Sequence, residues 1–459
     1  MTTPYPLLDT LHQQGIAPLS LSATDDGNLS VGGVTVRTLL ETYGSPLYVM
    51  DGSTLRANAQ AYTQACQQAF GQDKALVLYA CKANLSMGLA KLLAEEGMGF
   101  DAVSRGELLT LLRAGVSPDK IAFNGNNKTE ADLVFALDHG IRRIVVDNFD
   151  ELDLLCHVCE HLHTQANILV RVTPGIECHT HDYIRTGQHD SKFGIPLASV
   201  PALAQRLAQA DAQAHITLKG LHAHIGSQIF ELSAYDDLVT ILLQTYAQLR
   251  DEHGLTLTEL DVGGGLGMAY TQADDPPTPQ QLMDMLTKAL HRETQRHNLP
   301  VPFIYMEPGR SIVAKAGMTL YTVGSRKLPP QGALPYVAVD GGMGDNIRPA
   351  LYQAAYTAVV ASRLADYADP ATHETVRIVG HYCESGDVLL PNFTGPQLRR
   401  GDTLLVFGTG AYNYAMSSRY NRFPTPAMVL VEEGRHGWLV ARPTHDDLLA
   451  HDRCPAWLH

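Results

Sequence analysis

The chain is poor in positive charge and in long apolar runs, and each shortage narrows its possible function. Its 459 residues include 34 Lys and Arg against 48 Asp and Glu, which gives a formal net charge of −14 at pH 7. This balance, and the lack of a basic stripe, argue against a surface for nucleic acid or for anionic membranes. No window approaches about 18 uninterrupted apolar residues, so no transmembrane helix is predicted.

Paired cysteines and a leader are also lacking. Seven cysteines, an odd number spread over a long chain, are typical of buried or reactive thiols rather than of a disulfide framework. The opening MTTPYPLLDT has neither a basic region nor a long apolar region, both of which a secretory leader carries. We therefore expect a soluble protein in the cytoplasm.

What the chain does contain is a regular alternation of short apolar runs and amphipathic stretches from residue 76 to about residue 310. Helical stretches such as SRGELLTLLRAG open at a Ser, Thr or Asp and close at a Gly. The alternation predicts a (β/α)₈ barrel, with a doubly wound open sheet as the alternative. The predicted strands are Leu76–Ala80, Gly99–Val103, Ile121–Asn124, Ile144–Asp147, Ile168–Val172, Leu218–Ile225, Leu260–Gly263 and Phe303–Glu307.

The rest of the chain has a different pattern. After Ser311, short β-rich runs broken by Gly and Pro turns predict an antiparallel β domain, a sandwich or barrel over residues 311–459. Residues 1–45 contain LSVGGVTVRTLL, which we expect to pair with the C-terminal strands. The barrel is expected over residues 46–310, beginning at TYGSPLYVMDGSTL, with a loop at TQADDPPTPQQ.

Polar and glycine-rich motifs follow the predicted strands, and barrels of this kind carry their chemistry at the carboxyl ends of the strands. The first strand ends in YACKAN, the sixth in HAHIGSQ, the seventh in DVGGGLG and the eighth in EPGRS. Lys82 in the first motif either caps a strand end or forms a Schiff base, which partial burial of the amine would favour. The GGGLG run suits a phosphate cradle or a plain tight turn. Glu307 suits either a cofactor site or an ion pair. His224 is either a core histidine whose hydrogen bonds are satisfied or a planar ring stacked on a planar ligand.

A cluster of cysteine and histidine offers a competing interpretation. CHVCEHLH at 156–163 and CHTH at 178–181 are dense in zinc-type ligands, and C-x₂-C is a spacing found in zinc sites. However, Cys156 and Cys159 share helical spacing with neighbouring leucines, which predicts a buried helix face. We expect no metal.

Taken together, these motifs resemble the fold-type III pyridoxal-phosphate enzymes, which combine such a barrel with a β domain of the alanine racemase type. Four further segments narrow the resemblance to the meso-diaminopimelate decarboxylase family: HDYIRTGQHDSKFGI (181–195), VDGGMGDNIRPALY (339–352), YCESGD (382–387) and GAYNYAMSSRYN (410–421). The likeness runs from about residue 27 to about residue 432. It implies decarboxylation of meso-2,6-diaminopimelate to L-lysine and CO₂, the last step of lysine biosynthesis.

The resemblance also implies a role for each matching residue. Lys82, His224, Glu307 and Cys383 would be catalytic: Lys82 as the covalent anchor, His224 stacked on the cofactor ring, Glu307 at its nitrogen and Cys383 as the acid near Cα. The remaining residues expected to bind pyridoxal 5'-phosphate are Ser227, Gly264, Gly265, Leu266, Gly309, Arg310 and Tyr412. The substrate would be bound by Arg310, Arg348, Tyr352, Glu384 and Tyr412, with Cys383 and Glu384 arriving from the partner of a homodimer whose sites are shared.

Other activities on the same scaffold stay open. A decarboxylase of D-ornithine, D-lysine or a siderophore-pathway amino acid is the nearest alternative. An amino-acid racemase would place an arginine rather than Glu307 at the ring nitrogen, and a non-catalytic carrier of the cofactor would lack the β domain. Two guanidinium groups for one distal carboxylate favour the dicarboxylic substrate, because planar guanidinium forks bind carboxylates bidentately.

Overall fold

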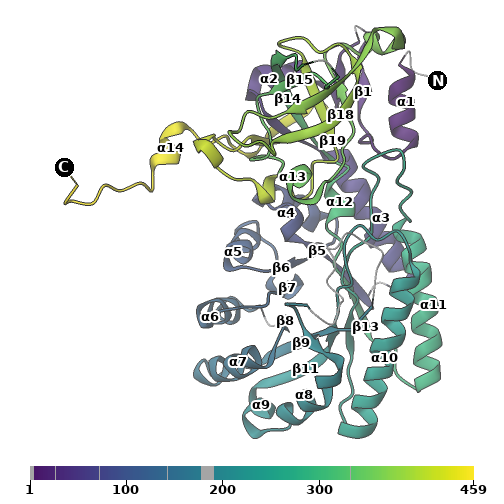
Figure 1. Cartoon of the computed structure of the whole chain (residues 1–459). Coiled ribbons are helices and arrows are strands. Elements are labelled where there is room, and N and C mark those ends of the chain that lie inside the picture. The colour runs from purple at the N-terminus through teal and green to yellow at the C-terminus, as the bar shows by residue number, and fades with distance from the viewer. Residues whose placement is uncertain are drawn as a thin grey trace. The chain divides into compact units, whose positions relative to one another are not determined.

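The structure is a computed structural model and describes residues 5–458 except Asp26, Gln72, Arg142, residues 177–190 and Gln331. The chain forms two compact units, coloured along the chain in Figure 1. Unit 1 comprises Met1–Leu55, Ala269–Asp274 and Val313–His459, and unit 2 comprises Arg56–Met268 and Asp275–Ile312. Each unit is described by itself below.

Unit 2 is a closed barrel of eight parallel strands. Each strand pairs with the next strand of the ring, and the pairing of β13 with β5 closes the barrel. The two-residue strand β10 (Ile195–Pro196) pairs with β9 in addition. The barrel is therefore confirmed and the open sheet is wrong. The strands are β5 (Ala75–Ala80), β6 (Gly99–Ala102), β7 (Ile121–Phe123), β8 (Arg143–Val146), β9 (Ala166–Thr173), β11 (Ile216–His222), β12 (Glu259–Asp261) and β13 (Phe303–Met306).

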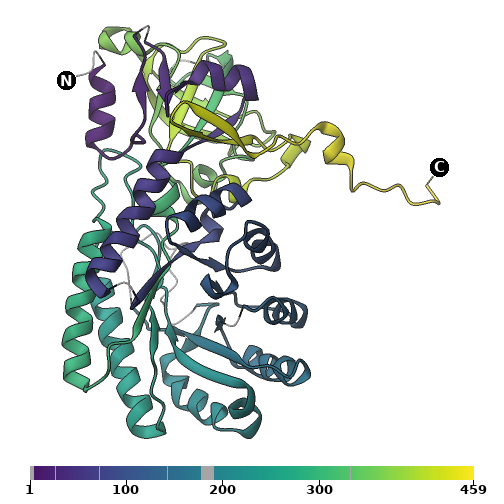
Figure 2. The same cartoon turned by 180° about the vertical axis from the view of Figure 1, so that it is seen from behind.

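Helices flank these strands on both sides in Figures 1 and 2. Short polar side chains set where they begin, since Ser86, Ser104 and Asn148 each accept a hydrogen bond from a backbone N–H in the first turn. Thr129 and Thr278 form capping boxes. The helices are α3 (Gly52–Phe70), α4 (Met87–Glu95), α5 (Arg105–Arg113), α6 (Glu130–Asp138), α7 (Phe149–His161), α8 (Val200–Leu207), α9 (Ala210–His215), α10 (Ser233–His253), α11 (Pro279–His297) and α12 (Arg310–Val313).

The barrel has a buried apolar core to which β5, β7, β8, β9 and β13 contribute side chains. Leu78, Ala122, Val145, Leu169 and Tyr305 form one buried apolar cluster there. At residues 216–222 the burial pattern of β11 departs from strict alternation, and its pairing with β9 shifts between Leu218 and Gly220. The barrel is therefore a packed core, and ligands can bind only at its ends.

Unit 1 contains a nine-stranded sheet. Most of its pairs are antiparallel, as expected for this half of the chain, but β15 pairs with β17 and β4 pairs with β20 in parallel. Its strands are β4 (Leu47–Asp51), β14 (Gly317–Lys327), β15 (Tyr336–Val339), β16 (Ala358–Val360), β17 (His373–Val379), β18 (Val388–Pro396), β19 (Thr403–Phe407), β20 (Ala427–Glu432) and β21 (Arg435–Val440). The helices are α1 (Pro6–Gln13), α2 (Val36–Tyr43), α13 (Arg348–Tyr352) and α14 (His445–Leu449).

Two local expectations differ from the structure near the N-terminus. β4, in the stretch expected to begin the barrel, instead pairs with β14 and β20. All five of its residues are buried, so its apolar pattern matches that of a barrel strand. β1 (Ser22–Ala23), β2 (Leu29–Val31) and β3 (Val34–Thr35) form a separate three-stranded sheet rather than pairing with the C-terminal strands.

The physical reason for this separate sheet is the turn between β2 and β3. Gly32 and Gly33 have φ values of 55° and 81°, which fold the chain back on itself as a tight hairpin. One backbone hydrogen bond, from Gly434 N to Gly32 O at 2.6 Å, links the hairpin to the C-terminal part of the unit. Within the described part of the chain, no helix is long and apolar enough to cross a membrane.

Candidate active site

Lys82 follows the first barrel strand. β5 ends at Ala80, and Lys82 lies in the short 3₁₀ turn Cys81–Ala83 between two buried neighbours. Its side chain is exposed, which corrects the expectation of a partly buried amine. Because the strand ends two residues earlier, Lys82 lies beyond the barrel wall rather than in it. Its positive charge helps to lower the pKa of Glu307, so the ammonium lies in the electrostatic reach of that carboxylate.

Glu307 directly follows the last barrel strand and is 5 % exposed. His222 Nε2 donates to Glu307 Oε2 at 3.0 Å, and Asn124 Nδ2 donates to Glu307 Oε1 at 3.0 Å. Burial alone would raise the pKa of Glu307, but the charge and hydrogen bond of His222, followed by the charge of Lys82, hold it below its ordinary value. The strand ends therefore hold a buried, ionised carboxylate.

Two further buried carboxyl groups adjoin Glu307. Burial, followed by the charge of Glu307, raises the pKa of Asp101 to about 7 and raises that of Asp261 well above its ordinary value. Asn124 Nδ2 also donates to Asp101 Oδ1 at 2.6 Å, so this amide links two of the acids. The site thus contains one ionised carboxylate beside acids that tend to keep their protons.

Asp101 and Asn124 belong to none of the motifs, and Asp261 begins the motif DVGGGLG without a predicted role. Their shared signal is a polar residue at the end of an otherwise apolar strand. The nitrogen or oxygen atoms with which His222, Asp261 and Glu307 could bind a metal ion lie within 4.8 Å of one another, a spacing that also suits a metal site. Both oxygens of Glu307 and Oδ1 of Asp261 already accept hydrogen bonds from protein groups, which favours a hydrogen-bonded network.

The glycine run forms a narrow turn beside His224. A Cβ at position 264 would lie 2.0 Å from the carbonyl oxygen of Glu307, and Gly265 has a φ of 115°. Only glycine fits both positions. The backbone N–H of Gly264 donates to His224 Nδ1 at 3.2 Å, so this amide is engaged by the histidine. Within the described residues the amides of Gly265 and Leu266 have no hydrogen-bond partner.

His224 is half-buried beside this turn. Burial, followed by the charges of Lys82 and Arg171, lowers the pKa of His224 well below its ordinary value. The ring is therefore neutral at pH 7, and its Nδ1 is the acceptor for Gly264. A neutral, planar ring at this point suits stacking on a planar ligand.

Ser227 and Arg310 provide a hydroxyl and a positive charge on the same unit. Arg310 is 5 % exposed, and its Nη2 and Nε donate to Ser227 Oγ at 2.9 and 3.3 Å. Gly309 precedes Arg310, and a Cβ there would meet the Cβ atoms of Ala83 and Ala80 at 3.0 and 3.1 Å. A guanidinium, a hydroxyl and backbone amides are the donor set that binds phosphate.

Unit 1 brings Arg348, Tyr352 and Tyr412 together. Arg348 is 7 % exposed, and its guanidinium carbon lies 5.0 Å from the ring centre of Tyr352 and 5.4 Å from that of Tyr412. Among the residues that the structure describes, Arg348 has no carboxylate partner and its buried Nε has no hydrogen-bond acceptor. A buried cation without a counter-ion favours an anionic ligand.

Cys383 and Glu384 are exposed on a loop of unit 1. The Cys383 N–H donates to Asn421 Oδ1 at 2.9 Å, and Tyr420 Oη donates to Cys383 O and to Glu384 Oε2 at 3.4 and 3.5 Å. Next to them, the ring of His381 stacks on Phe423 at 3.8 Å between centres. Residues 420–423 therefore fix the backbone of the motif while its side chains face water.

The cysteine and histidine cluster divides between described and undescribed residues. Cys156 and Cys159 are buried on α7, and burial raises the pKa of both thiols. This is the helix face that their spacing predicts. The CHTH segment and most of HDYIRTGQHDSKFGI lie outside the described residues.

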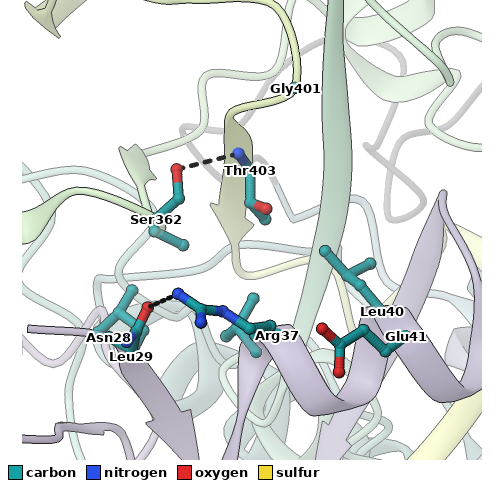
Figure 3. Close-up of a pocket in the computed structure, with 10 residues that line it drawn as sticks. Asn28, Leu29, Arg37, Leu40, Glu41, Ser362, Gly401 and Thr403 are labelled. Atoms are coloured by element: carbon teal, nitrogen blue, oxygen red, sulfur yellow. Dashed lines mark hydrogen bonds between the residues drawn. The ribbon is translucent and has the colours of Figure 1, made fainter. Parts of the chain in front are cut away.

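Unit 1 also has a cavity of about 430 Å³ that contains none of the candidate residues. Figure 3 shows Arg37 reaching toward Asn28, to whose Oδ1 it donates at 3.2 Å, and Ser362 beside Thr403. Glu41, one helical turn from Arg37, also lines it. It has no histidine, cysteine or lysine among its lining residues and is not a candidate for the active site. The lining residues are Asn28, Leu29, Val36, Arg37, Leu40, Glu41, Ala361, Ser362, Gly401 and Thr403.

Comparisons with known proteins agree with this geometry. The family model of the pyridoxal-dependent decarboxylases, pyridoxal binding domain, matches residues 56–314. The chain is 44% identical to a diaminopimelate decarboxylase of Bacillus subtilis, over 93% of this chain and 95% of that protein. It is 41% identical to one of Synechocystis, over 96% and 94%. A crystal structure of diaminopimelate decarboxylase from M. jannaschii with L-lysine is similar at a TM-score of 0.88 and 31% identity, covering 97% of this chain and 100% of that one.

Proposed function

The chain belongs to the diaminopimelate decarboxylases, a family of pyridoxal-phosphate-dependent carboxy-lyases, and from this premise we propose that it converts meso-2,6-diaminopimelate to L-lysine and CO₂. This reaction is the last step of lysine biosynthesis. The observation that carries the proposal is the buried, ionised carboxylate of Glu307, on the same unit as Lys82 and the glycine turn. No observation on the described residues favours a related amino acid over this substrate.

The cofactor of the enzyme is pyridoxal 5'-phosphate, and the residues of unit 2 fit it. The backbone amides of Gly265 and Leu266 have no other partner among the described residues, and a side chain would clash within the turn that carries them. These amides, with Ser227 and Arg310, supply donors for a phosphate dianion. Lys82 offers an exposed primary amine for covalent attachment to the aldehyde.

Glu307 and His224 would act on the cofactor ring. When bound, the cofactor withdraws the electron pair that departing CO₂ leaves on Cα. Glu307 would hold a proton at the ring nitrogen, which strengthens that withdrawal, and its lowered pKa keeps it available as an acceptor. His224, whose pKa is lowered, would stack as a neutral ring and add no competing charge.

Arg348 would bind the distal carboxylate of the substrate. Its buried guanidinium has no counter-ion among the described residues, so a bound carboxylate would supply one. Tyr352 and Tyr412 lie against Arg348 and would add hydroxyl donors, and Arg310 would contribute to the same end of the substrate. A lysine or ornithine substrate lacks that carboxylate and would leave Arg348 unpaired.

Cys383 and Glu384 would serve the active site of a partner subunit in a homodimer. The proposal is supported by their exposure and by the fixed backbone of their loop. Glu384 would bind the distal ammonium group, and Cys383 would deliver the proton to Cα after CO₂ leaves. The described cysteines are free thiols, which suits the reducing cytoplasm as the proposed location.

The test is CO₂ release from meso-diaminopimelate, lysine, ornithine and arginine at equal concentrations. We expect the kcat/KM for meso-diaminopimelate to exceed that of each monocarboxylate by at least about 100-fold, because a site with a buried polar group rejects analogues that leave it unpaired. Comparable rates on ornithine or lysine would contradict the proposed substrate. Borohydride reduction should place the phosphopyridoxyl group on Lys82, and recovery of the label on another lysine would contradict the assigned anchor.

A further inference from the structure

The C-terminal residues form an arm, defined here as residues 444–458, that leaves its own unit. After β21 the chain enters the short helix α14 and then runs on without regular structure. Figures 1 and 2 both show the arm extending away from the strands of unit 1. Each of residues 451–458 is exposed, and the exposed fraction is 77% for Trp457, 53% for Leu458 and 52% for Leu449.

The arm has a defined conformation despite this exposure. Thr444 and Asp447 form a capping box that starts α14, and the backbone N–H of Leu458 donates to Pro455 O at 2.9 Å. Arg422 Nη2 pairs with Asp452 Oδ2 at 2.7 Å. Termini with polar sequences usually stay mobile, whereas this one presents a tryptophan and leucines in water. A tryptophan of this kind would bury about 150–250 Å² against a partner.

We propose that the arm docks on a second copy of this chain. This inference rests on the proposed function, in which Cys383 and Glu384 serve the partner's active site. Arg422, which holds the arm, directly follows Asn421, whose Oδ1 accepts the hydrogen bond from the Cys383 N–H. The arm is therefore held close to the loop that carries the proposed shared residues, on the side of the unit that would face the partner.

We assign the receiving surface of the second copy to three exposed apolar residues of the barrel. Met87, Val103 and Leu109 are exposed by 55%, 39% and 37%, and they lie on consecutive strand–helix units of the barrel. Met87 begins α4, which follows the turn with Lys82, and Val103 follows β6. Met87 and Val103 thus follow the carboxyl ends of β5 and β6, the end of the barrel to which the partner's Cys383 and Glu384 would be delivered. Trp457 and Leu458 would bury against this surface of the second copy.

Tryptophan fluorescence tests the docking directly, because the chain has two tryptophans. In a Trp438→Phe variant of the full chain, Trp457 is the reporter. We expect its emission to shift to shorter wavelength, and iodide quenching to fall, as concentration rises through the dimer dissociation constant measured by sedimentation. The matched Trp457→Phe variant, which reports on Trp438 against Tyr43, should show no such change. Water-like emission of Trp457 in a verified dimer, or shifted emission in a verified monomer, would overturn the proposal.

Two substitutions locate the contact. Trp457→Ala should raise the dimer dissociation constant by about tenfold or more, as expected for an aromatic anchor at an interface. Leu328→Ala, at a site that is 72% exposed on the same unit, should leave it unchanged. Met87→Asp places an acid at the start of a helix, where it is tolerated, and should return Trp457 to water-like emission. Unchanged emission in Met87→Asp would overturn the assignment of the receiving surface.

The same samples separate this inference from the proposed function. Decarboxylation of meso-diaminopimelate by the unaltered chain reports on the function alone. If that activity is present and the dimer is insensitive to Trp457→Ala, the arm proposal fails while the function stands. If the arm behaves as expected and the activity is absent, the proposed function fails.

Discussion

Replacing Glu307 by glutamine should slow decarboxylation because it removes a charge that the structure holds in place. Glu307 accepts hydrogen bonds from His222 and Asn124, one on each oxygen, and its pKa is held below the ordinary value. A glutamine has a single acceptor oxygen for these two donors and no charge for the ring nitrogen. The loss of one charge-assisted hydrogen bond, about 1.5–3 kcal/mol, corresponds to a rate reduced by about 10- to 150-fold.

Asp261→Asn is the matched control for this substitution. Asp261 is buried beside Glu307, but its pKa is raised well above the ordinary value, first by burial and then by the charge of Glu307. The Asp261 carboxyl therefore tends to keep its proton, and asparagine is the neutral group closest to it in shape. The asparagine oxygen can still accept the bond from Gly263 N that Asp261 Oδ1 accepts at 2.8 Å. We expect kcat to change by less than about threefold.

The assay is CO₂ release under saturating meso-diaminopimelate, with cofactor content measured in each variant. The visible absorbance of the bound cofactor provides a second readout, because loss of the proton at the ring nitrogen alters its spectrum while a merely structural defect lowers occupancy. Equal losses of kcat in Glu307→Gln and Asp261→Asn would refute the reasoning. The charge would then not reside on Glu307 in the working enzyme.

Three further predictions follow from the described residues. Arg348→Ala should raise KM for meso-diaminopimelate by about 10- to 150-fold with unchanged cofactor content, because one charge-assisted contact is lost; an unchanged KM would place the distal carboxylate elsewhere. Mixing inactive Lys82→Ala and Cys383→Ala subunits should restore about a quarter of the activity if sites are shared in a dimer, and verified heterodimers without activity would argue against sharing. Burial raises the pKa of Asp345 to about 7 in the folded chain, above its value in the unfolded chain. The stability that the protonated carboxyl contributes is therefore fully present below the pKa of the unfolded chain and is lost as pH rises through about 7. Asp345→Asn should flatten this loss in denaturation curves at about pH 5 and about pH 8, and an unchanged slope would contradict the raised pKa.

The barrel could be predicted from the sequence because each of its strands is a short apolar run followed by an amphipathic helix. All eight predicted strands are present, and the end residues differ by a few positions. For β4 the sequence predicts a barrel strand, and this prediction is wrong because a fully buried strand has the same apolar pattern wherever it pairs. The apolar pattern around Gly32 and Gly33 predicts a strand that joins the C-terminal sheet, whereas the paired glycines form the turn of a separate hairpin.

The residues of the candidate site could be predicted where they belong to a sequence motif. They could not be predicted where only tertiary contacts bring them to the site. Lys82, Glu307 and the glycine run end strands in recognisable motifs, and the structure brings them to one unit. Asn124 and Asp101 have no motif, and their contacts with each other and with Glu307 bridge three separate strands. The end of the strand at Ala80 was predictable, but the exposure of Lys82 was not, because an apolar strand before a lysine does not reveal which groups cover the side chain that follows it.

The position of positive charge explains how an acidic chain can bind anionic ligands. A net charge of −14 opposes the approach of a phosphate or a dicarboxylate over the whole surface. The structure offsets this locally with two buried guanidinium groups, Arg310 against the hydroxyl of Ser227 and Arg348 against the rings of Tyr352 and Tyr412. The buried Nε of Arg348 has no hydrogen-bond partner among the described residues, so the attraction of this guanidinium group remains available to a ligand. Selectivity for a dicarboxylic substrate thus depends on where individual buried charges lie, and the net charge of the chain does not reveal their positions.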